Sequence, residues 1–110
     1  MGFVKRTPPA ESAARIVINV PEDLPLELVS QFLASCREDL ARLQTALAAK
    51  DYDQARRLGH QLKGNGSPYG FPDVTLIGSA IEQAAAAGGA IELASQIQLL
   101  ETHLSLVEIA

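Results

Sequence analysis

The sequence predicts an all-α protein, an antiparallel up-down four-helix bundle with an extended N-terminal arm. Hydrophobic residues make up 47% of the chain but aromatic residues only 5%, so the core must be built from aliphatic side chains and alanine, which suits close helix packing. Apolar residues recur at spacings of three and four in four separate segments, as on the buried face of a helix. The loops between these segments are short, and helices joined by short loops pack antiparallel.

The chain of 110 residues has the size of one domain, which we expect to span residues 24–110, after an arm of residues 1–23. The arm contains two adjacent prolines and a run, residues 16–20, whose apolar side chains alternate as in a strand. Because the rest of the sequence offers no partner strand, we expect this run to lie extended against the bundle. The arm is either a packed lead-in segment or a binding segment for a partner.

The first helix is predicted to follow Leu24-Pro25, because a proline with Glu22 and Asp23 before it is typical of a helix amino terminus. Its buried face recurs at helical spacing and consists of Val29, Phe32, Leu33, Cys36, Leu40, Leu43 and Leu47. The chain has one cysteine, which cannot form an internal disulfide, and we interpret it as a small buried side chain.

The second helix is predicted to begin after Lys50, with Asp51 or Asp53 as its cap. On a helix of about 100° per residue, four of its residues fall within roughly 100° of one another and form the buried stripe: Ala55, Leu58, Gly59 and Leu62. His60 lies roughly 150° from the centre of that stripe. The histidine is therefore expected to face solvent.

The third helix is predicted to follow Gly70-Phe71-Pro72, with Asp73 as its cap and Gly78 permitting close approach to a neighbouring helix. Its apolar face consists of Val74, Ile77, Ile81 and Ala84. Gly88-Gly89 should end it, since glycine tolerates positive φ. The last helix then begins near Ala90, and its stripe consists of Leu93, Ile97, Leu100, Leu104 and Val107.

Small and cationic residues surround His60 on the second helix. Arg56, Lys63, Gly64 and Ser67 all lie within about 60° of it. Neutral imidazole is a nucleophile near physiological pH, and a phosphoryl group on its nitrogen would bring about two negative charges that need donors. Lys63 can supply positive charge, and Gly64 leaves room for another protein's catalytic atoms. A lone surface histidine is usually only a solvated side chain. The interpretation of His60 as a phosphate-binding nucleophile therefore depends on the small and cationic residues around it.

The stretch His60-x-Leu62-Lys63-Gly64, with a small residue at position 67, Gly70 and then an apolar helix to Glu82, resembles the histidine-containing phosphotransfer (HPt) domains of bacterial phosphorelays. The predicted helices around the motif extend this resemblance over most of the chain. The position before the histidine is often alanine in such domains and is Gly59 here, and the turn carries Ser67-Pro68.

The resemblance implies that His60 accepts a phosphoryl group from a receiver-domain phospho-aspartate and passes it to an aspartate of another response regulator. The implied partners are receiver domains and a hybrid sensor histidine kinase, and the Mg²⁺ would belong to the receiver. Lys63 would stabilise the phosphate, while Arg56, Gly64 and Ser67 would lie on the docking face and Gly70 in the turn after the site. The alternative is a helical adaptor that binds receiver domains without transfer.

Other kinds of site find little support in the sequence. No glycine-rich loop ends in Gly-Lys-Ser or Gly-Lys-Thr, so we expect a phosphoryl carrier without its own ATP site and not an enzyme. His103 is the only other histidine, and without an HExxH motif or a Cys/His cluster we expect no metal and no cofactor. Four acidic residues are interpreted as solvated helix charges, namely Glu38, Asp39, Glu82 and Glu92.

The composition of the chain also argues against two kinds of binding partner, nucleic acids and membranes. The net charge is −4 and no broad basic stripe is present, which argues against nucleic-acid binding. No apolar run approaches the roughly 18 residues of a membrane span, and the first residues do not resemble a signal peptide. We therefore expect a cytoplasmic protein that does not contact the membrane and acts as a monomer.

Overall fold

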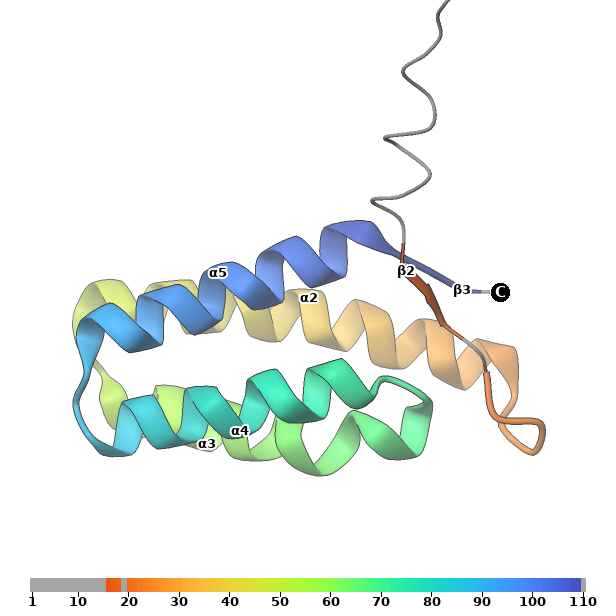
Figure 1. The fold of residues 1–110 in the computed structure, drawn as a ribbon, viewed down its shortest axis with the longest axis horizontal. Helices are drawn as coiled ribbons and strands as arrows, with labels where there is room; N and C mark the ends of the chain where they lie inside the picture. The colour runs from red at the N-terminus through yellow and green to blue at the C-terminus, as the bar shows by residue number, and fades with distance from the viewer. Residues whose placement is uncertain (1–15, 19, 110) are drawn as a thin grey trace, which may run out of the picture.

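Four helices form a bundle in the computed structural model, which describes residues 16–18 and 20–109. In chain order they are α2 (Leu26–Ala49), α3 (Tyr52–Asn65), α4 (Pro72–Ala86) and α5 (Ala90–Leu106), with a 3-10 turn, η1 (Ser67–Tyr69), between α3 and α4. Figure 1 shows α2 lying along α5 and α3 lying along α4, with consecutive helices running in opposite directions. The predicted antiparallel up-down four-helix bundle is confirmed.

Two short strands bring together segments from opposite ends of the chain (Figure 1). Strand β2 (Ile16–Ile18) pairs in parallel with β3 (Val107–Ile109), so that Ile16 lies opposite Val107. The prediction that residues 16–20 have no partner strand is therefore wrong. Val107 was assigned to the last helix because it continues the apolar spacing of α5, but its extended backbone begins β3. The expectations for residues 1–15 and 19 lie outside the described residues.

The helix ends agree with the predicted ones except at the start of α4 and at the end of α5, where Val107 leaves the helix. Asp51 caps α3, since its carboxylate accepts a hydrogen bond from the backbone N–H of Gln54 at 3.1 Å. Asp73 was predicted to cap α4, which is wrong. Pro72 already occupies the first turn, where its missing N–H costs nothing, so Phe71 takes the cap position without a side-chain bond.

The core is aliphatic apart from one aromatic cluster at the end of the bundle where η1 lies. Phe71 is fully buried, and the Phe32 ring centroid lies 4.6 Å from that of Tyr69 and 5.3 Å from that of Phe71. Cys36 is buried in α2, and this burial raises the pKa of its thiol to about 12. The cysteine is therefore a small core side chain, as expected.

Asp39 differs from its predicted role as a solvated charge. Only 8% of the residue is exposed, and its Oδ1 accepts a hydrogen bond from Arg42 Nη1 at 3.2 Å. Burial raises the pKa of the Asp39 carboxyl, although Arg42 opposes that shift. The reason is its position in α2, three residues after Cys36 and four before Leu43, which places it on the buried face.

Helices α3 and α4 lie very close because glycine faces glycine. A Cβ atom at Gly59 would lie 2.7 Å from the backbone nitrogen of Glu82 and 2.9 Å from the carbonyl oxygen of Gly78. A Cβ atom at Gly78 would lie 2.5 Å from the backbone nitrogen of Lys63. Neither position can carry a side chain unless the opposite helix moves. The close approach predicted at Gly78 is confirmed, and it brings the next turn of α4 alongside α3.

Candidate functional site

His60 lies on the outer side of α3, with 67% of its side chain exposed. The buried residues of α3 are Ala55, Leu58, Gly59 and Leu62, the same four that the helical spacing predicts. The expectation that the imidazole faces solvent is therefore confirmed. Its ring is anchored on one side and open on the other.

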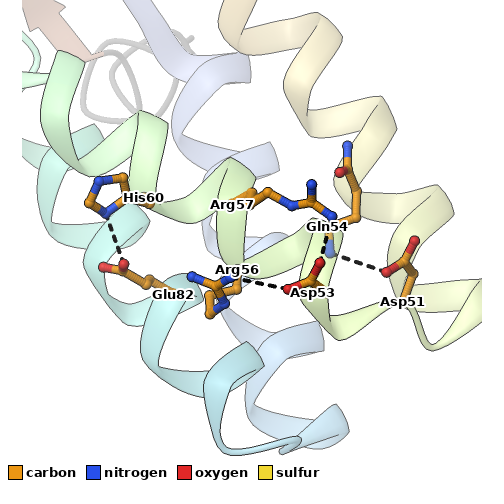
Figure 2. Close-up of polar contacts among 7 residues, drawn as sticks. All are labelled: Asp51, Asp53, Gln54, Arg56, Arg57, His60 and Glu82. Carbon is orange, nitrogen blue, oxygen red and sulfur yellow. Dashed lines mark hydrogen bonds and ion pairs between the residues drawn. The ribbon is translucent and has the colours of Figure 1, made fainter.

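The anchor is Glu82 of α4, whose carboxylate joins two residues of α3. Glu82 Oε2 lies 2.9 Å from His60 Nδ1 (Figure 2), and Oε1 lies 2.8 Å from Lys63 Nζ. Only 21% of the Glu82 side chain is exposed. The interpretation of Glu82 as a solvated charge is therefore wrong. The sequence did hold a sign of this contact, because Gly78 lies one helical turn before Glu82 on the same face of α4.

The contacts of Glu82 determine which nitrogen of the imidazole is available for chemistry. Hydrogen bonds from Lys63 and then His60 lower the pKa of the Glu82 carboxyl, so it is ionised at neutral pH and only accepts hydrogen bonds. In the neutral ring Nδ1 must then carry the proton, which leaves the lone pair on Nε2. Figure 2 shows this second nitrogen pointing away from Glu82.

The two arginines before His60 pair with Asp53 near the start of α3 (Figure 2). Arg56 Nη2 donates to Asp53 Oδ1 at 3.1 Å, and Arg57 Nη2 donates to Asp53 Oδ2. The hydrogen bond from Arg56, followed by the charge of Arg57, lowers the pKa of the Asp53 carboxyl. Arg56, which was expected on the docking face, is thus held by Asp53 in this structure and is not joined to Glu82.

The end of α3 after the histidine is open on its outer side. A Cβ atom at Gly64 would meet nothing within 4 Å. Ser67 is exposed and begins η1, and its backbone N–H donates to the Thr75 hydroxyl at 2.7 Å. Gly70 ends η1 with a φ of 91°, a conformation that favours glycine, and its N–H donates to the Ser67 carbonyl at 2.9 Å. Thr75 did not figure in the sequence prediction, because its contacts cross from α4 to α3.

Three hollows on the described surface lie away from His60. They have volumes of 310, 220 and 350 Å³ and are lined respectively by α2 with the start of α3, by α4 with the start of α5, and by the other ends of α4 and α5. His60 lines none of these three. Among residues 16–18 and 20–109, no three His, Cys, Asp or Glu side chains are grouped so that they could hold a metal ion.

A family model described as the Hpt domain matches residues 27–110. The chain belongs to this family. Hpt domains have a histidine phosphotransfer role in phosphorelays, as phosphoryl carriers and not as enzymes with ATP sites. Comparison with curated proteins and with solved structures gave no match.

The match to the Hpt domain begins in the first turn of α2 and runs through all four described helices into β3, so it includes His60 and the residues around it. No helix in the described part of this Hpt domain is both long and apolar enough to cross a membrane. Hpt domains interact with receiver domains and kinases.

Proposed function

We propose that His60 is the phosphoacceptor of this Hpt domain, receiving a phosphoryl group from a phospho-aspartate on a receiver domain and passing it to an aspartate of another response regulator. A hybrid sensor histidine kinase would supply the first receiver. The observation that supports this proposal best is the exposed imidazole, held through Nδ1 by the Glu82 carboxylate that also binds Lys63.

In the proposed reaction the lone pair on Nε2 attacks the phosphorus atom of the aspartyl phosphate. A P–N bond forms while the P–O bond to the aspartate breaks, and the aspartate carboxylate leaves with that electron pair. The ring becomes positively charged, and the neighbouring Glu82 carboxylate stabilises this charge through the Nδ1–H bond. The second transfer reverses these steps on another aspartate. The Mg²⁺ for both steps would be bound by the receiver.

The remaining site residues would act on the phosphate or on the partner. Lys63 is one helical turn from His60, and its flexible side chain could move from Glu82 to the phosphoryl oxygens. Gly64 and Ser67 would contact the docked receiver, with Gly70 closing the turn behind them. Arg56 would contribute only if it left Asp53. An adaptor that binds receivers without transfer remains the competing function.

The test is a transfer profile against the receiver domains of the source organism, each charged with radiolabelled acetyl phosphate. We expect acid-labile label on the protein from at least one receiver. His60→Gln should abolish labelling and leave the melting temperature nearly unchanged, because the side chain is exposed. His103→Gln is the matched control and should keep the label. Complex formation without labelling would support the adaptor, and undiminished labelling of His60→Gln would eliminate His60 as the acceptor.

A further inference from the structure

The hydroxyl of Thr75, in the first turns of α4, binds the backbone of one residue near the end of α3, Lys63, and of the first residue of η1, Ser67. Thr75 Oγ1 accepts a hydrogen bond from the Ser67 N–H at 2.7 Å and donates one to the Lys63 carbonyl at 3.0 Å. In a continuing α-helix the N–H of residue 67 would donate directly to the carbonyl of residue 63. The hydroxyl is therefore inserted into the hydrogen-bond ladder of α3 at the point where that helix ends.

Gly66 makes this insertion possible. A Cβ atom there would lie 2.6 Å from both the backbone nitrogen and the Oγ1 of Thr75, and 2.7 Å from the Phe71 carbonyl oxygen. The Gly66 N–H still donates within the helix, to the Leu62 carbonyl at 3.0 Å, while the Gly66 carbonyl accepts from the Phe71 N–H at 2.8 Å. The last hydrogen bond of α3 and the hydrogen bond that closes the turn around η1 are thus both made by Gly66, directly beside the Thr75 side chain.

The same face of α4 also carries the anchor of His60. Thr75, Gly78 and Glu82 follow one another at spacings of three and four, which places them on one side of the helix. Gly78 sets the close approach to α3, Glu82 holds the imidazole and the Lys63 ammonium, and Thr75 holds the Lys63 carbonyl. Lys63 is therefore fixed by α4 through both its side chain and its backbone.

We propose that Thr75 is a positioning residue for phosphotransfer, which fixes where α3 ends and so places Lys63 and the Gly64–Ser67 surface for the incoming receiver. This inference rests on the proposed function of His60. Without the hydroxyl, the Ser67 N–H and the Lys63 carbonyl lose the group that joins them, so the end of α3 and Ser67 must shift to find other hydrogen-bond partners. A receiver would then meet an altered surface one turn beyond the histidine.

The test compares Thr75→Val, which keeps the shape and removes the hydroxyl, with Thr75→Ser, which keeps the hydroxyl. For transfer from a charged receiver that labels the wild type, Thr75→Val should lower kcat/KM about fivefold, mainly through a higher KM, as expected for one lost hydrogen-bonding group. Thr75→Ser should stay within about twofold of the wild type. The Ser67 amide resonance in a ¹H–¹⁵N spectrum should shift in Thr75→Val and remain in place in Thr75→Ser.

Ile97→Val is the control for stability, because Ile97 is a buried core residue of α5 and makes none of the hydrogen bonds that Thr75 makes with Ser67 and Lys63. It should lower the melting temperature without changing KM. The positioning role of Thr75 would be overturned if Ile97→Val and Thr75→Val changed kcat and KM equally, or if Thr75→Val kept the wild-type kcat and KM. Either result would leave His60 as the acceptor. If no receiver labels the wild type, the function proposed for His60 fails, and an unmoved Ser67 resonance in Thr75→Val overturns the positioning role separately.

Discussion

Alanine at position 59 should destabilise the bundle, whereas alanine at position 64 should stabilise it. Both substitutions remove a glycine from α3 and gain about 0.5–1 kcal/mol from lower backbone entropy in the unfolded chain. At Gly64 the new methyl group meets nothing within 4 Å. At Gly59 it would lie 2.7 Å from the Glu82 nitrogen and 2.9 Å from the Gly78 oxygen. Both are backbone atoms, so α4 itself must move, and such overpacking costs about 1–3 kcal/mol.

The comparison isolates this steric cost, since the helix-propensity gain is nearly the same in both variants. With about 4–8 °C per kcal/mol for a domain of this size, Gly59→Ala should melt at least about 4 °C below Gly64→Ala. Thermal unfolding followed by circular dichroism at 222 nm measures the gap, and urea denaturation gives the two free energies. Equal melting temperatures would refute the argument that the α3–α4 distance depends on the missing side chain at Gly59.

Six other variants test the core, the docking face, the carboxylate anchor and the second histidine. Leu62→Ala should lose about 2–5 kcal/mol of stability in urea denaturation, because the side chain is buried; a loss below about 0.5 kcal/mol would mean that its burial is misassigned. Gly64→Gln should weaken receiver binding, measured by calorimetry, and also lower the transfer rate, whereas Lys63→Ala should chiefly slow transfer. Normal transfer in Gly64→Gln would show that the surface around Gly64 is not the docking face. Glu82→Ala should slow labelling about tenfold or more, and Glu82→Gln should slow it less, since the amide oxygen still accepts the hydrogen bond from Nδ1–H. A Glu82→Ala rate equal to that of the wild type in rapid-quench assays would argue against the role of Glu82 as anchor. Burial lowers the pKa of His103 in the folded protein, so the unfolded chain, whose imidazole titrates near 6.5, takes up the proton first. The free energy of unfolding should therefore decrease as the pH falls through 6.5 towards the lower pKa of the folded protein, and His103→Leu should remove this decrease in urea titrations. A slope that persists in that variant would contradict the assignment.

The parts of the fold that depend on one helix at a time could be predicted from the sequence. The buried stripe of α3 follows from residue spacing alone, because a helix turns by a fixed angle per residue and its apolar residues must share a face. The exposure of His60 follows from the same geometry. The motif around it then indicates the family without any knowledge of how the helices pack.

Contacts between helices were the part that could not be predicted. Glu82 and Thr75 reach the site from α4. Gly78 indicates that α4 approaches a neighbouring helix closely, but spacing within α4 does not show which atoms of α3 these two side chains meet. Asp39 is buried because its neighbours on α2 are, even though a carboxylate usually stays in water. Val107 continues a helical spacing, but pairing with β2 gives it an extended backbone, so tertiary contact overrides the local pattern.

The parallel pair of β2 and β3 has a consequence for the order in which the chain folds. Contacts of α3 with α4, and of α4 with α5, join neighbours in sequence and close only short loops. The strand pair instead joins residue 16 to residue 107, so in the unfolded chain it would have to close a loop that contains every helix, at a high cost in chain entropy. Once the bundle has formed, its helices have already brought those ends together. The three-residue strands can then pair last in folding and separate first in partial unfolding, while α3 and α4 stay packed against each other at the histidine.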